Sequence, residues 1–119
     1  MSIPSLQLLV IKSLDPEKLS KDYEILGLSF QKHKHENGAL HYAADLHGLI
    51  FEIYPLPKDL LVADNTTRLG FRVKSLDNLL NKLRLSNWKI ASDAKHIEFG
   101  YTAVVQDSDG RKVELTEQQ

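Results

Sequence analysis

Four of the five histidines fall within fifteen consecutive residues, a density that could support metal binding or proton transfer. The group consists of His33, His35, His41 and His47. His33 and His35 are two positions apart, which places both rings on one face of a strand, so a metal site is one interpretation. The other is a solvated hairpin tip, because charged residues alternate with these histidines (Lys32, Lys34 and Glu36) and hairpin tips are exposed.

His41 differs from its neighbours because it lies in the strand-like stretch "ALHYAAD", among small residues that leave space around a ring. It could line a cleft as an acid, a base or a hydrogen-bonding group, or it could be a satisfied histidine within a sheet. Tyr54 is two positions from Glu52, so both should lie on one face of a strand. His96, in "DAKHIEFG", is expected in a surface loop.

An internal repeat organises these residues. The stretch "KSLD" occurs at 12–15 and again at 74–77, a shift of 62 positions (74 − 12). The same shift carries Asp45 onto Asp107, Gly48 onto Gly110 and Glu52 onto Glu114. A fixed internal period is typical of duplicated structural units. The sequence therefore predicts one domain, residues 1–119, made of two modules at 1–57 and 64–119 that are joined by 58–63.

Each module is predicted to fold as a strand, a helix and three strands, which gives an α+β protein. Asp15 is the expected N-cap of the first helix, with Pro16 in its first turn, and Asp77 is the expected N-cap of the second. Turn signals, "ENG" at 36–38 and "SDG" at 108–110, separate strand-like runs. In the second module "WKIAS" predicts a short strand over 88–92.

Composition narrows the possible functions. The net charge is −1, from 15 basic and 16 acidic residues, so no nucleic-acid or anionic-membrane partner is expected. No apolar run reaches the roughly 20 residues that cross a bilayer, and the N-terminus does not resemble a signal peptide. The chain has no cysteine, which excludes disulfides and thiolate chemistry and fits a cytoplasmic location.

The order of these elements resembles the glyoxalase, bleomycin-resistance and extradiol-dioxygenase superfamily, also called the vicinal oxygen chelate proteins. The motifs that carry the resemblance are "VIKSLDPEKLSKDYEILGL" (10–28), "HGLIFEIYP" (47–55) and "QDSDGRKVELTE" (106–117). The resemblance implies curved, antiparallel-rich sheets around a shared cleft, with helices outside. It also implies a divalent metal in many members, held by the first and last strands of each module.

Carried over to this chain, the resemblance places Glu52 and Glu114 at the two last-strand ligand positions. The matching first-strand positions hold Leu6 and Arg68, neither of which can bind a divalent cation. A slip of one residue would offer Gln7 instead, although Gln7 alternates with apolar residues expected to face the helix. We therefore expect no metal; if one binds, Glu52 and Glu114 with Gln7 or His41 would hold it.

Arg68 has a specific role in this interpretation. Two carboxylates at a former metal position would repel one another, and a guanidinium between them can replace the cation. The sequence thus predicts a Glu52–Arg68–Glu114 cluster in the ligand cleft. The alternative is that Arg68 extends into solvent. The other expected cleft residues are His41, Tyr54, Leu6 and Leu8.

Three functions stay open at this point. The leading hypothesis is a small-molecule-binding protein without the metal site and without catalysis. The first alternative is a metal-dependent lyase or isomerase of the glyoxalase type, and the second is a dimerisation module without a ligand. A homodimer is expected because the apolar stretch "LLV" at 60–62 lies between the modules.

Overall fold

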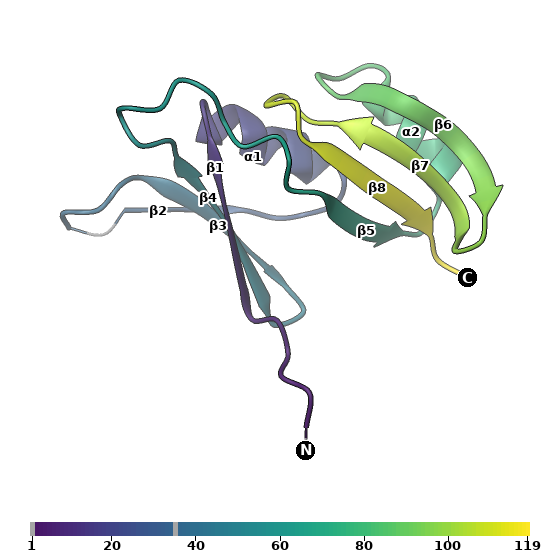
Figure 1. Ribbon diagram of the computed structural model, residues 1–119, viewed down its shortest axis with the longest axis horizontal. Helices are drawn as coiled ribbons and strands as arrows, with labels where there is room; N and C mark the ends of the chain where they lie inside the picture. The colour runs from purple at the N-terminus through teal and green to yellow at the C-terminus, as the bar shows by residue number, and fades with distance from the viewer. Residues whose placement is uncertain (1, 35) are drawn as a thin grey trace. The chain divides into compact units, whose positions relative to one another are not determined.

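The computed structural model of the protein describes residues 2–34 and 36–119, and it divides the chain into two compact units, Met1–Ala63 and Asp64–Gln119. Unit one contains β1 (Leu8–Ser13), α1 (Pro16–Ile25), β2 (Gln31–His33), β3 (His41–Leu46) and β4 (Leu49–Pro55). Its four-stranded sheet has the order β1-β4-β3-β2, in which β1 is parallel to β4 and the other pairs are antiparallel (Figure 1).

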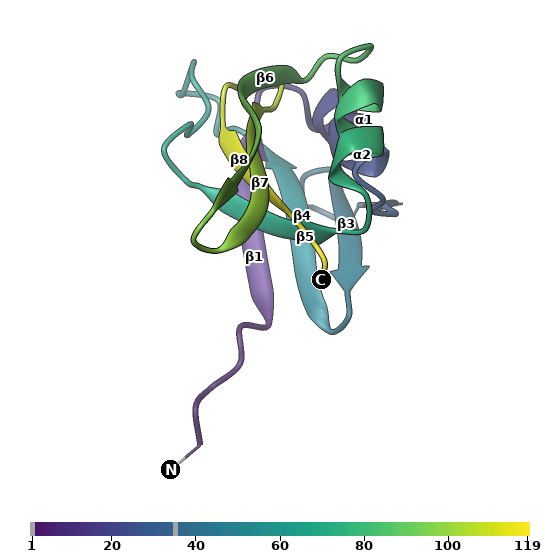
Figure 2. The same cartoon turned by 90° about the vertical axis from the view of Figure 1, so that its right-hand side faces the viewer.

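Unit two repeats this architecture. It contains β5 (Leu69–Val73), α2 (Leu76–Leu83), β6 (Lys89–Ile97), β7 (Gly100–Gln106) and β8 (Lys112–Glu117), and its sheet has the order β5-β8-β7-β6. Strand β5 is parallel to β8, and the helix lies along one side of its own sheet (Figure 2). The prediction of two βαβββ modules in an α+β fold is confirmed.

Each core lies between a helix and one face of its sheet. In unit one Leu19 and Tyr23 of α1 are fully buried with Phe51 and Ile53 of β4, and the Tyr23 and Phe51 rings meet edge to face at 5.5 Å. In unit two Leu80 and Leu83 of α2 are buried, as are Val113 and Leu115 of β8. Since side chains alternate along a strand, Glu52 and Glu114 lie on the face away from the helix.

The two helices begin at different points of the repeated "KSLD". Asp15 is the N-cap of α1, as predicted, and its Oδ1 accepts a hydrogen bond from the Lys18 amide at 3.2 Å. The prediction for α2 is wrong, because Ser75 is its N-cap and Asp77 lies in its first turn. The Asp77 carboxylate instead accepts a hydrogen bond from the Tyr101 hydroxyl at 2.7 Å.

Strand register explains why identical tetrapeptides take different positions. Val10 pairs with Glu52, whereas Gly70 pairs with Glu114. The first strands are therefore related by 60 positions (70 − 10) and the last strands by 62 (114 − 52). The repeat in the sequence matched all residues of the two modules by one shift of 62 positions. For β1 and β5 that match is wrong by two residues, because their structural equivalents are 60 positions apart. Because two residues return a side chain to the same face, the predicted faces are unaffected.

The predicted turns at 36–38 and 108–110 are confirmed, and one strand is longer than expected. Strands β3 and β4 are joined by His47 and Gly48, both with positive φ (56° and 98°), which is the two-residue turn that suits a twisted hairpin. Strand β6 runs to Ile97, so His96 lies in a strand and not in a loop; its ring contacts Tyr101. His35 lies outside the described residues. Within the described part of the chain, no helix is long and apolar enough to span a membrane.

Candidate functional site

The candidate site is built on the face of the unit-one sheet that faces away from α1. His41 Nε2 lies 3.3 Å from Glu52 Oε2, and the His41 side chain is only 1% exposed against 19% for Glu52. The other ring nitrogen, Nδ1, lies 3.2 Å from the Ala39 carbonyl oxygen. Both ring nitrogens therefore lie close to an oxygen acceptor, and at least one of them can donate a hydrogen bond.

His41 belongs to a row of four side chains, one from each strand, which we call the cross-strand ladder: Lys12, Tyr54, His41 and His33. The His41 and Tyr54 rings are stacked, with centroids 4.2 Å apart and planes 5° from parallel. Lys12 Nζ lies over the Tyr54 ring at 4.9 Å, and the His33 ring lies 5.6 Å from that of His41. Strand register produces this row, because Lys12 pairs with Tyr54 and His33 pairs with His41.

A pocket of about 540 Å³ lies beside the ladder. Its lining mixes hydrogen-bonding and apolar groups: Ser29, Gln31, His33, His41, Ala43, Ala44, Asp45, Ile50 and Glu52. Ala43 pairs with Gln31 on one side and with Glu52 on the other, and its small methyl group leaves open space at the centre of this face. The arrangement can hold a flat or amphipathic molecule, with Ile50 as an apolar wall and the imidazole and carboxylate as polar contacts.

Sequence reasoning singled out only some residues of the pocket and the cross-strand ladder. It predicted His41, Glu52 and Tyr54, and the structure brings these three together in unit one. It assigned His33 to a solvated hairpin tip; His33 is exposed, yet its ring contacts His41 and lines the pocket. Gln31 and Lys12 were also missed. Side chains on one face of a strand repeat every two residues, so the residues in phase with Glu52 on the neighbouring strands could have been identified from the sequence.

The apolar residues predicted for the cleft extend the same face toward the N-terminus. Leu8 pairs with Ile50 and is 52% exposed, and Val10 pairs with Glu52 and is 38% exposed. Leu6, which precedes β1, is 69% exposed. Gln7 lies one residue before β1, out of phase with Leu8 and Val10, and its carbonyl accepts a hydrogen bond from the Ile50 amide at 2.8 Å. Exposed aliphatic side chains beside a polar pocket favour an amphipathic ligand.

In unit two Arg68 lies beside Glu114, as predicted. Arg68 Nε is 3.4 Å from Glu114 Oε1, and the two side chains are 51% and 50% exposed. An ion pair this open to solvent contributes at most about 1 kcal/mol. The larger Glu52–Arg68–Glu114 cluster stays a prediction. The shift of 62 positions matched Arg68 with Leu6. The strand register instead makes Leu8 the structural counterpart of Arg68.

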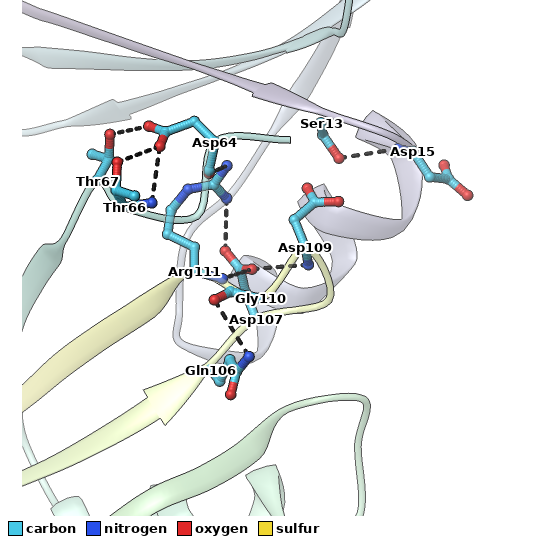
Figure 3. Close-up of polar contacts among 10 residues, drawn as sticks. All are labelled: Ser13, Asp15, Asp64, Thr66, Thr67, Gln106, Asp107, Asp109, Gly110 and Arg111. Carbon is cyan, nitrogen blue, oxygen red and sulfur yellow. Dashed lines mark hydrogen bonds and ion pairs between the residues drawn. The ribbon is translucent and has the colours of Figure 1, made fainter. Parts of the chain in front are cut away.

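A buried ion pair fixes the segment that leads into Arg68 (Figure 3). Arg111 Nη1 lies 2.8 Å from Asp107 Oδ2 with both side chains fully buried, and Arg111 Nη2 donates to the Asp64 carbonyl at 2.8 Å. Hydrogen bonds from Thr66 and then Thr67 hold the pKa of the Asp64 carboxyl well below its usual value. The hairpin between β7 and β8 thereby anchors residues 64–67.

The side chains around Glu52 and Glu114 do not form the metal site that the resemblance implies. In the described part of the chain, no group of three or more His, Cys, Asp or Glu side chains is placed to hold a metal ion. Glu52 is paired with His41 and Glu114 with Arg68. Since an arginine keeps its proton, the Glu114 position as it stands does not fit a divalent cation.

Comparison with known proteins gives similarity only at the level of structure. No family model and no curated protein matches the sequence. A glyoxylase/bleomycin resistance protein/dioxygenase domain from Frankia sp. EAN1pec has 19% identity and a TM-score of 0.79, covering 99% of this chain and 100% of that one. TnmS3, an antibiotic binding protein from Streptomyces sp. CB03234, has 20% identity and a TM-score of 0.75, covering 100% and 99%. The hypothetical protein SA1046 from S. aureus has 15% identity and a TM-score of 0.76, covering 99% and 96%.

These similarities extend over almost the whole chain. The protein therefore has the fold of the glyoxalase, bleomycin-resistance and dioxygenase proteins. The resemblance inferred from the sequence is confirmed for the fold.

Proposed function

We propose that the protein binds a small amphipathic organic molecule, such as an antibiotic or a metabolite, in the unit-one pocket and does so without catalysis. The observation that carries the proposal is the pocket of about 540 Å³ beside the stacked His41 and Tyr54 rings, with aliphatic Leu8 and Ile50 on the same face. Few, well-placed polar groups within an apolar surround are typical of small-molecule sites. The structural similarity to TnmS3, an antibiotic binding protein, supports this class of ligand.

Filling the pocket tests the proposal. Ala43→Leu replaces a methyl group with an isobutyl group at the centre of the pocket face. We therefore expect the affinity for any ligand found in a screen of aromatic antibiotics and metabolites to fall about tenfold or more. Binding is measured by isothermal titration calorimetry. Lys32→Leu is the matched control, because Lys32 pairs with Tyr42 on the opposite face of the same sheet and its replacement should leave affinity unchanged.

Three outcomes would contradict the proposal. A ligand that binds Ala43→Leu as tightly as the wild type does not use this pocket. Stoichiometric binding of zinc, nickel or manganese, with turnover of a glyoxalase-type substrate, would instead support the metal-dependent lyase or isomerase. A screen without any ligand, together with stable self-association, would support the dimerisation module.

We also propose that the protein is a homodimer and that it is cytoplasmic. Residues 60–62 carry three exposed apolar side chains: Leu60 at 51%, Leu61 at 85% and Val62 at 73%. Exposed apolar patches on small domains are typical of interaction surfaces. Sedimentation at micromolar concentration should give twice the 13.5 kDa chain mass, and Leu61→Ser should shift the species toward the monomer. A wild type that sediments only at 13.5 kDa would contradict the dimer.

A further inference from the structure

The cross-strand ladder has a counterpart in unit two with different chemistry. In unit one Ala43 pairs with Glu52, and the ladder residues His41 and Tyr54 follow two positions away. In unit two Val104 pairs with Glu114, and two positions away Thr102 pairs with Thr116. Small hydroxyl side chains therefore replace two stacked rings, and their Oγ1 atoms lie 3.1 Å apart.

The cation at the end of the ladder is retained. Lys12 pairs with Tyr54, and Arg72 pairs with Thr116 in the same register. In unit one the ammonium lies over an aromatic ring. In unit two no ring occupies that position, because threonine replaces tyrosine. The guanidinium instead borders open space: Arg72 and Thr116 together line two hollows, of about 480 Å³ and 280 Å³.

Arg72 also has no carboxylate partner within residues 2–34 and 36–119, whereas Arg68, Arg84 and Arg111 each have one. Two glutamates lie close by but are engaged elsewhere. Glu114 faces Arg68, and Glu117 Oε1 accepts a hydrogen bond from the Leu76 amide at 3.0 Å. The larger hollow therefore contains a guanidinium without an ion-pair partner beside a hydroxyl group, with the Glu117 side chain and the amide side chain of Gln118 also in its lining.

We propose that Arg72 and Thr116 bind the carboxylate of an organic monoacid, whose apolar body lies against Phe99. Phe99 lines the larger hollow and is 79% exposed, so its ring is open to a ligand. A guanidinium binds a carboxylate through two parallel hydrogen bonds. The two neighbouring glutamates disfavour a dianion such as phosphate. This site is built from residues of unit two, whereas the pocket of the proposed function is built from residues of unit one.

Benzoate is a suitable probe, with benzamide as its neutral isostere and inorganic phosphate as the dianionic comparison. In a titration followed by amide chemical shifts, benzoate should move the signals of Thr116 and Gln118, while benzamide and phosphate should leave them in place. Arg72→Gln should weaken benzoate binding by about tenfold or more, and Arg72→Lys should restore part of it. Arg84→Gln is the control, since Arg84 pairs with Asp93 and lines neither hollow.

Equal binding of benzoate and benzamide, preference for phosphate, or unchanged affinity in Arg72→Gln would each overturn the carboxylate site. So would the absence of any benzoate-induced shift in unit two. Ligand binding in the unit-one pocket is measured separately, by the effect of Ala43→Leu on affinity and by ligands that shift the amide signals of unit-one residues. A carboxylate site can therefore be refuted while the unit-one pocket stands, and the reverse also holds.

Discussion

Replacing Arg111 with methionine is expected to lower the free energy of unfolding by about 3–5 kcal/mol, the largest effect of any single change proposed for this protein. The Arg111 and Asp107 side chains are fully buried and joined at 2.8 Å. Methionine keeps the unbranched stem of the side chain but removes the guanidinium that pairs with the buried Asp107 carboxylate. The Asp64 carbonyl loses its donor at the same time. Urea denaturation followed by circular dichroism measures the change.

The control for this experiment is Arg84→Met. Arg84 and Asp93 are similarly close, at 2.7 Å, but their side chains are 43% and 72% exposed, so the loss should stay below about 1 kcal/mol. Replacing both partners, in Arg111→Met with Asp107→Leu, should recover part of the stability, because no buried charge is then left alone. Equal losses for Arg111→Met and Arg84→Met would show that burial does not govern the pair.

His41→Ala is expected to destabilise unit one by about 2–3 kcal/mol and to abolish ligand binding in the pocket. The change removes a ring that is 1% exposed, its stacking on Tyr54 and the partner of Glu52. His41→Phe separates packing from chemistry. Phenylalanine restores the stacked ring but offers no nitrogen to Glu52, so most of the stability should return while binding stays weak. Thermal denaturation and calorimetric titration on the same samples distinguish the two effects.

A His41→Phe variant that binds ligand as well as the wild type would show that the imidazole only fills space. A His41→Ala variant with unchanged melting would contradict the stacked, buried position of the ring. The two experiments test different roles of His41, because the His41→Phe experiment measures ligand binding and the His41→Ala experiment measures stability.

The sequence by itself determined the order of the elements and the face that each strand residue occupies. Alternation along "LIFEIYP" places Glu52 and Tyr54 together and buries Phe51 and Ile53, because side chains on a strand repeat every two residues. The cap at Asp15 followed from local chemistry, since the bond to the Lys18 amide spans only three residues.

Only the tertiary structure decided how the strands pair, and the details of the site depend on that pairing. Two identical "KSLD" segments take positions two residues apart, because parallel register between distant strands is set by packing and not by the tetrapeptide. The same register aligns His33, His41, Tyr54 and Lys12 into one ladder. Arg111 directly follows the "SDG" turn in the sequence, yet it is fully buried, because Asp107 and the Asp64 carbonyl both meet it only when the hairpin closes against residues 64–67.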